Sequence, residues 1–244
     1  MNPILILMLG DCTLATSYLP SRLKNETRLA EALEQRFPGE QIKVVNEGLD
    51  GEAVSGFLRR YQRTMARYPQ PDYLLLRYGV NDRRTDAIAG FRANLTGLIE
   101  RLRADYPRTR LLLETGMYVD YPAHYAWDRN AKMQPVYDAI RSLGAAYGLP
   151  VVDIYERMKA ETERGNWDLR VRGYGVVDDH IPVLGAGQDH IHGHDVRWYT
   201  NIHPNPLGIE VIADEEARVL ARHWPDGLRS SSPAVAQSQP SQAR

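Results

Sequence analysis

A thiol, an imidazole and a side-chain amide stand at positions in this chain where they could act together on an acyl group. Cys12, the only cysteine, comes three residues after the end of an apolar run, and Asn81 follows a second one. His203 stands just before the last helical pattern, which Asn205 can cap and Pro206 can open. In acyl-transfer chemistry a thiol attacks, a histidine removes its proton, and N–H groups hold the developing oxyanion.

Three N–H groups are candidates for holding that oxyanion: the main-chain amides of Cys12 and Gly51 and the side-chain amide of Asn81. Gly51 has no side chain, so its amide can approach a ligand closely. A helix N-terminus at Cys12 would lower the pKa of the thiol. Each group also has a plain structural interpretation, with Cys12 as a small buried hydrophobe, Asn81 as a turn residue and His203 as a histidine beside a helix cap.

Alternating strand and helix patterns must position these groups. Five short runs rich in apolar or β-branched residues are typical of strands: residues 4–9, Gln41–Asn46, Asp72–Tyr78, Arg110–Thr115 and Leu149–Ile154. Helical patterns carry apolar faces at Leu29, Leu33 and Phe37, at Ile88, Phe91, Leu95, Leu98 and Leu102, over residues 130–147, and at Ile209, Ala213, Ala217 and Leu220. This alternation predicts an α/β fold, a three-layer α/β/α sandwich around a parallel sheet of roughly five strands.

Such a sheet would bring the candidate groups together. Parallel strands end at one common edge, where open α/β sheets place their ligand sites. The loops that carry Cys12, Gly51 and Asn81 each follow a predicted strand, so they should meet at this edge, and the segment around His203 could fold back over it.

Length and composition indicate one domain. The chain has 244 residues, of which 43% are hydrophobic and 25% charged, and we assign residues 1–229 to this domain. Residues 166–202 form a long loop expected near the site. Residues 230–244, rich in Ser, Pro, Gln and Ala, are expected to be a disordered tail.

Charge and hydropathy exclude several classes of function. A net charge of -1 provides no broad basic field for nucleic acid. No apolar run approaches the roughly 18 residues of a membrane span. The N-terminus lacks the basic region of a signal peptide, so we expect a cytoplasmic location for the chain as written, with a leader removed beforehand left open. One cysteine allows no internal disulfide.

Four segments, in this order, resemble the SGNH (GDSL-like) hydrolase and esterase family. They are Gly10-Asp11-Cys12, Gly51, Gly79-Val80-Asn81-Asp82 and His203-Pro204-Asn205, and the resemblance spans residues 3 to about 224. It implies a flavodoxin-like three-layer fold, hydrolysis of carboxylic esters and no cofactor. It also implies that Asp11 helps to position the nucleophile loop. Many members of the family remove O-acetyl groups from carbohydrates.

Two positions depart from the family pattern. Cys12 stands where a serine is usual, and Thr200 stands where the family has its triad aspartate, three residues before the histidine. A thiol needs less help from a base, because its pKa of about 8.5 leaves a few per cent of thiolate at neutral pH. Thr200 could accept a hydrogen bond from His203, and Asp195 or Asp189 in the long loop could orient the imidazole instead.

Cys12 leaves three interpretations open. It is a native nucleophile, a replacement engineered into a serine esterase, or the mark of a family member that has lost activity. The other site residues favour an ester hydrolase, of the carboxylesterase or acetylesterase type, that acts through Cys12 and His203. The alternatives are an acyltransferase that passes the acyl group to a sugar or alcohol, and a catalytically silent binding protein that keeps the pocket.

Other side chains suggest the substrate. Tyr118 and Trp127 follow the fourth predicted strand, and with Trp198 and Tyr199 they could form an aromatic wall for a sugar ring. Arg77, at the end of the third predicted strand, could contact an anionic group of the substrate. We therefore expect a small-molecule or carbohydrate ester as the partner, with the oligomeric state left open.

A cluster of histidines raises the question of a metal. In an extended chain, His190, His192 and His194 would point to one face and could bind zinc or copper. The alternative is a solvated loop near the cleft, which we prefer because the run contains a glycine and nothing else signals a metal site. The sequence therefore predicts neither a metal nor a cofactor.

Overall fold

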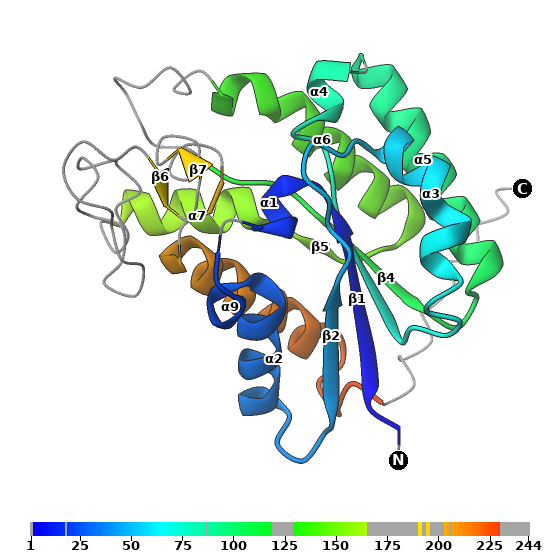
Figure 1. Ribbon diagram of the computed structural model, residues 1–244, viewed down its shortest axis with the longest axis vertical. Helices are drawn as coiled ribbons and strands as arrows, with labels where there is room; N and C mark the ends of the chain where they lie inside the picture. Colours follow the sequence, from blue (N-terminus) through cyan, green and yellow to red (C-terminus); the bar gives the residue numbers. More distant parts are fainter. Residues whose placement is uncertain are drawn as a thin grey trace, which may run out of the picture.

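A parallel sheet of five strands forms the centre of the molecule (Figure 1). The computed structural model describes residues 2–17, 19–85, 87–118, 129–164, 190–191, 194–195, 203–204 and 206–229. The strands are β1 (Ile4–Gly10), β2 (Ile42–Asn46), β3 (Tyr73–Arg77), β4 (Arg110–Glu114) and β5 (Val151–Val152). Their order, β2-β1-β3-β4-β5, is that of flavodoxin-like doubly wound sheets. The predicted fold class is confirmed.

Helices cover both faces of this sheet. One face packs against α2 (Asn25–Arg36), α7 (Ile154–Glu163) and α9 (Pro206–His223). The other face packs against α3 (Val54–Met65), α5 (Ile88–Asp105) and α6 (Arg129–Tyr147). Three short elements lie in the connections: α1 (Cys12–Ala15), the 3-10 turn η1 (Ser21–Leu23) and α4 (Asp82–Thr85).

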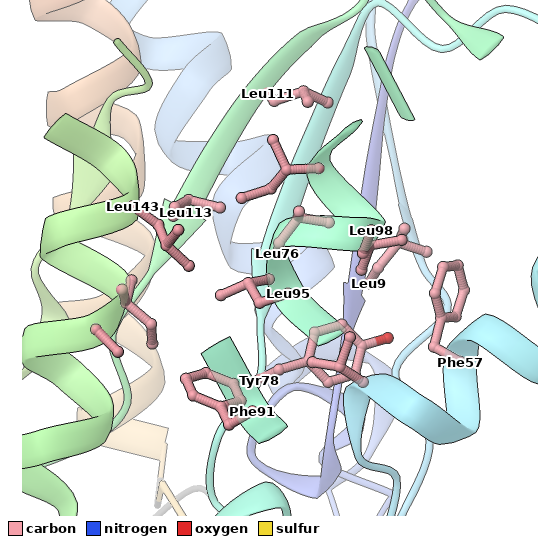
Figure 2. Packing of buried hydrophobic residues seen from close by; sticks show 14 of the residues in the cluster. Leu9, Phe57, Leu76, Tyr78, Phe91, Leu95, Leu98, Leu111, Leu113 and Leu143 are labelled. Carbon is pink, nitrogen blue, oxygen red and sulfur yellow. The ribbon is translucent and has the colours of Figure 1, made fainter. Parts of the chain in front are cut away.

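Successive residues of each central strand serve opposite faces. Met8 and Leu75 belong to the core under α2 and α9, whereas Leu9 and Leu76 belong to the core under α3, α5 and α6. Figure 2 shows the second core, in which leucines from neighbouring strands meet Phe57 and other helix side chains. Because strand side chains alternate between faces, a strand buried on both sides needs an unbroken apolar run, and that run made these strands predictable.

The fifth strand is shorter than the predicted Leu149–Ile154. Pro150 has no N–H to donate to a neighbouring strand, although its carbonyl accepts from Leu113 at 3.0 Å. Asp153 already caps α7, since its side chain accepts from the N–H of Glu156. These two residues leave only Val151–Val152 for the strand.

The histidine run does not form one extended segment. His190–Ile191 (β6) pairs antiparallel with His194–Asp195 (β7), so the chain reverses direction between them. His192 lies outside the described residues, and the paired arrangement of the other two histidines differs from the single extended run on which the less favoured metal-binding interpretation depended. Most of the 166–202 loop and all of the 230–244 tail lie outside the described residues, as does Asn205, the predicted cap of α9.

Among the described helices, none has the length and apolar character needed to cross a membrane.

Truncation of the central strand should test the core. Leu75 is fully buried in β3, so Leu75→Ala should lower the free energy of unfolding by about 2–5 kcal/mol through lost burial and the cavity left behind. Leu207→Ala on α9, where the side chain is 42% exposed, is the matched control and should change it by less than about 0.5 kcal/mol. Urea denaturation measures the free energy of unfolding of each variant. Equal losses in the two variants would contradict the burial of Leu75 in the core.

Candidate active site

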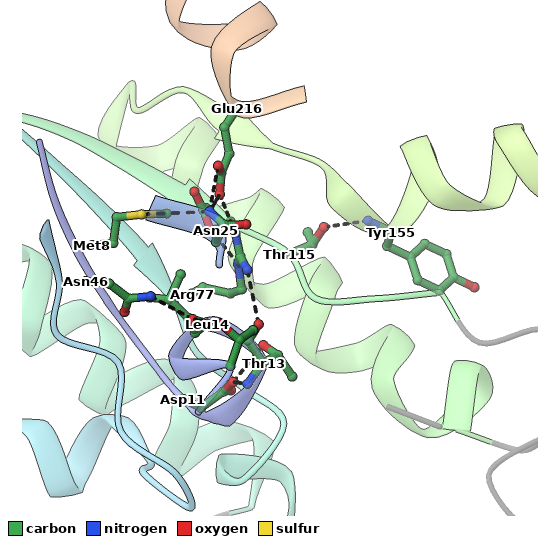
Figure 3. Close-up of polar contacts among 12 residues, drawn as sticks. Met8, Asp11, Thr13, Leu14, Asn25, Asn46, Arg77, Thr115, Tyr155 and Glu216 are labelled. Carbon is green, nitrogen blue, oxygen red and sulfur yellow. Dashed lines mark hydrogen bonds and ion pairs between the residues drawn. The ribbon is translucent and has the colours of Figure 1, made fainter. Parts of the chain in front are cut away.

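The turn between β1 and α1 presents the only cysteine at the carboxyl edge of the sheet (Figure 1). Asp11 caps α1, and its carboxylate accepts hydrogen bonds from the N–H of Thr13 at 2.9 Å and the hydroxyl of Thr13 at 2.7 Å (Figure 3). Gly10 must lack a side chain, because a Cβ there would lie 2.5 Å from the carbonyl oxygen of Arg77. This tight approach places Cys12 at the start of α1.

Two N–H donors converge on the sulfur of Cys12. The side-chain nitrogen of Asn81 lies 3.9 Å from the sulfur and also donates to the carbonyl of Glu52 at 3.1 Å. The main-chain N–H of Gly51 also acts on the sulfur, since it favours the thiolate and opposes the rise in the pKa of the thiol. Gly51 has φ of +76°, a left-handed conformation that glycine adopts at little cost. The structure thus brings together Cys12, Gly51 and Asn81 from three separate loops.

Hydrogen bonds between these loops keep the donors in place. The second carboxylate oxygen of Asp11 accepts from the N–H of Val80 at 3.4 Å. Asp82 accepts from the N–H of Val54 at 2.8 Å, which joins the Asn81 loop to the start of α3. Because these groups are buried, each bond is costly to break, and the three loops behave as one unit.

His203 lies at the same edge of the sheet. It is 2% exposed and comes three residues before α9. Glu216 in α9 contacts Arg77 at the carboxyl end of β3, whereas the carbonyl of Leu228 accepts from the hydroxyl of Tyr73 at its amino end. Helix α9 therefore runs antiparallel to the sheet, and the chain just before it extends past the carboxyl edge.

The partners proposed for His203 are not described. Thr200 and Asp189 lie outside the described residues, and Asp195 is described only by its main chain in β7. The roles of these residues therefore stay predictions.

The thiol of Cys12 is held in its neutral form. Burial, and then the charge of Asp11, raise the pKa of Cys12 to about 12, although the N–H of Gly51 and the amide of Asn81 act in the opposite direction. The prediction that a helix N-terminus lowers this pKa is therefore wrong. Helix α1 has only four residues, and removal of the thiol from water outweighs any field from so short a helix. Burial also raises the pKa of Asp11 to about 6.

Arg77 does not face the substrate region, which corrects its predicted role. Its side chain is buried, with one nitrogen 2.7 Å from Glu114 and another paired with Glu216 (Figure 3). The guanidinium thus serves two internal carboxylates. The sequence did contain a signal for this buried ion pair. Two apolar strands each end in a charged residue: Arg77 follows Leu74–Leu76, and Glu114 follows Leu111–Leu113.

Only one of the predicted aromatic residues is described. Tyr118 is partly buried and packs edge-on against Tyr155, with ring centroids 5.5 Å apart. Trp127, Trp198 and Tyr199 lie outside the described residues, so the aromatic wall stays a prediction.

Two residues that hold the site were not among the predicted site residues. The carbonyl of Glu52 anchors the amide of Asn81, and Asp82 anchors the start of α3. Asp82 belonged to the Gly79–Asp82 segment that carried the family resemblance, and its position beside Asn81 could have indicated it. Glu52 acts through its main-chain carbonyl, so the type of its side chain gave no indication of this role.

Comparison with known proteins identifies the family. A profile of the GDSL-like lipase/acylhydrolase family matches residues 8–211, a range that contains Cys12, Gly51, Asn81 and His203. The chain belongs to this family. Its membership supports an ester-hydrolase activity.

Solved structures share the fold. LAE5, an α/β hydrolase from the metagenome of Lake Arreo, Spain, is 17% identical with a TM-score of 0.63, over 88% of this chain and 94% of that one. Axe2, an acetylxylan esterase from Geobacillus stearothermophilus, is 16% identical with a TM-score of 0.63, over 90% and 95%. A lipase/acylhydrolase from Enterococcus faecalis is 22% identical with a TM-score of 0.60, over 88% and 94%. A search among curated proteins found no match.

The neutral thiol predicts how Cys12 responds to alkylation. At pH 8 a thiol with a pKa near 12 has on the order of 10⁻⁴ of its population as thiolate, against about a quarter for an unfolded cysteine. Iodoacetamide should therefore modify the native protein at least about 10³-fold more slowly than the urea-unfolded chain. The native rate should rise about tenfold per pH unit from pH 7 to 10, because the thiolate fraction grows in this way below the pKa. A plateau of the native rate below pH 9 would contradict the raised pKa.

Proposed function

We propose that the protein hydrolyses carboxylic esters through Cys12 and His203. The observation that carries the proposal is the convergence of the Asn81 amide and the Gly51 N–H on the sulfur of Cys12. When the sulfur bonds to a carbonyl carbon, the carbonyl oxygen comes within reach of donors placed around the sulfur. Together with the N–H of Cys12, they form a three-donor oxyanion hole that stabilises the negative charge of the tetrahedral intermediate.

In the proposed reaction, His203 removes the thiol proton as the sulfur attacks the carbonyl carbon. The tetrahedral intermediate collapses to a thioester, and His203 returns the proton to the departing alcohol oxygen. Water, deprotonated by His203, then attacks the thioester and releases the acid and the free thiol. Because the pKa of Cys12 is raised, proton removal accompanies attack and no stable thiolate precedes it.

The substrate we propose is an ester of a carbohydrate, with acetyl as the acyl group. Its support is that acetylxylan esterases occur among the solved structures that share this fold. Tyr118, Trp127, Trp198 and Tyr199 are the proposed sugar-contacting residues. Thr200 or Asp195 is proposed to orient the imidazole. The reaction as proposed uses no cofactor.

Acyl transfer is the second candidate, and the burial of the thiol favours it. Cys12 is only 6% exposed, so a thioester formed there would be shielded from water. A sugar or alcohol bound beside it could then accept the acyl group. Addition of a sugar acceptor during turnover, with mass spectrometry for an acetylated product, distinguishes transfer from hydrolysis.

Activity toward p-nitrophenyl acetate tests the proposed roles. Cys12→Ala should abolish activity above background, since the nucleophile is gone. Asn81→Ala should lower kcat by about 10²–10³-fold, as expected for loss of one oxyanion donor. Gln62→Ala, which removes an exposed side-chain amide near the carboxyl end of α3, is the matched control and should leave kcat within about twofold, as surface substitutions usually do.

Cys12→Ser separates the interpretations of the cysteine. If neither the unaltered chain nor the serine variant exceeds the alanine variant, the proposed enzyme activity is wrong and a silent binding protein is favoured. If only the serine variant is active, the cysteine replaces an original serine.

A further inference from the structure

A buried charge network lies directly beneath the candidate active site. Arg77, at the carboxyl end of β3, is 1% exposed, and its guanidinium lies between Glu114 at the end of β4 and Glu216 in α9 (Figure 3). Both glutamates are fully buried. Apolar residues of similar volume often stabilise a core as well as a buried ion network does, so stability alone gives little reason for these charges.

Arg77 contacts the residue on each side of the cysteine. Its carbonyl oxygen accepts from the N–H of Asp11 at 3.1 Å. One nitrogen of its side chain donates to the carbonyl of Thr13 at 3.4 Å. The main chain and the side chain of one residue therefore hold both ends of the turn that carries Cys12.

Glu216 connects the same guanidinium to the helix that follows His203. Its carboxylate also accepts from the side-chain amide of Asn25 in α2, at 3.0 and 2.9 Å. A helix advances about 1.5 Å per residue, so a slip of α9 by one residue would take the carboxylate out of hydrogen-bond reach. The contacts of Glu216 thus set the axial position of α9 relative to the sheet.

The network holds two carboxylates against one guanidinium. Burial, and then the charge of Glu114, raise the pKa of Glu216 well above its usual range, although Arg77 and Asn25 oppose the shift. Burial thus favours the neutral form of Glu216, and glutamine is a neutral residue of nearly the same shape. In this variant the remaining side-chain oxygen can still accept from Arg77 and from Asn25, so the link between Arg77 and α9 is kept.

We propose that Arg77, Glu114 and Glu216 form a positioning network for catalysis. Arg77 fixes the turn of Cys12, and Glu216 fixes the start of α9 and with it the approach of His203 to the thiol. Because water does not reach the buried guanidinium of Arg77, Glu114 supplies the negative charge that balances it. The inference rests on the proposed function, since it assigns the network to the reaction of Cys12 with an ester.

Variants of Glu216 test the histidine side of the network. Glu216→Met removes the link between Arg77 and α9 but leaves Arg77 paired with Glu114. Its kcat for p-nitrophenyl acetate should fall at least tenfold, because a misplacement of about 1 Å can cost 10²-fold in rate, while KM stays within twofold. Glu216→Gln should keep kcat within twofold. The kcat values of the two variants are compared only if each variant unfolds cooperatively on heating and has the circular dichroism spectrum of the unaltered chain.

Variants of Arg77 test the cysteine side. Arg77→Lys keeps one charge but cannot reach both glutamates and the carbonyl of Thr13 together. It should loosen the turn and speed the alkylation of Cys12 by iodoacetamide at pH 8 at least tenfold. Glu216→Met should leave that rate within twofold, since the turn keeps its contacts with Arg77. Arg77→Met is the second variant if the lysine variant does not fold.

Several results would overturn the proposal. They are an unchanged kcat in folded Glu216→Met, an equal loss in Glu216→Gln, or an unchanged alkylation rate in folded variants of Arg77. Alkylation needs no ester hydrolysis, so it separates the two proposals. If the unaltered chain hydrolyses no ester, the proposed function fails, and faster alkylation in Arg77→Lys still supports the hold of Arg77 on the turn.

Discussion

The buried carboxylate of Asp11 organises the carboxyl edge of the sheet. It accepts from the N–H and the hydroxyl of Thr13 and from the N–H of Val80, so one side chain joins the turn after β1 to the turn after β3. Water cannot replace these bonds at a residue that is 1% exposed, and a buried donor left without an acceptor costs about 1–3 kcal/mol. The conformation around Cys12 follows from satisfying these donors.

The same burial bears on the proposed role of Cys12 as a nucleophile. Reactive cysteines commonly depend on a positive field that stabilises the thiolate. Here burial, and then the nearby carboxylates of Asp11 and Asp50, favour the protonated thiol and raise its pKa. The site therefore has the electrostatics that suit a neutral attacking group, such as a serine hydroxyl, even though sulfur occupies the position. In the proposed reaction, Cys12 therefore resembles a serine in its need for a base at the moment of attack.

Local patterns predicted the fold because each central strand is buried on both faces and shows it as an unbroken apolar run. They failed at β5, where the proline at position 150 and the cap at Asp153 shorten the strand. The convergence of Cys12, Gly51 and Asn81 could be predicted from strand ends and family resemblance. The role of Arg77 could not, because it depends on β3, β4 and α9 meeting in three dimensions. The raised pKa of Cys12 likewise depends on tertiary burial.

The position of α9 late in the sequence affects the order in which the protein folds during synthesis. This helix supplies Ile212, Ala213 and Leu220 to one core, and the carbonyl of Leu228 beyond it receives hydrogen bonds from Tyr73 and Arg110 at the far end of the sheet. Synthesis proceeds from the N-terminus, so the sheet face that α2 and α7 cover in part stays incompletely covered until α9 leaves the ribosome. The imidazole emerges at the same stage. In a nascent chain the thiol is therefore present early, whereas His203 and the helix that completes this core arrive together, once α9 has been made.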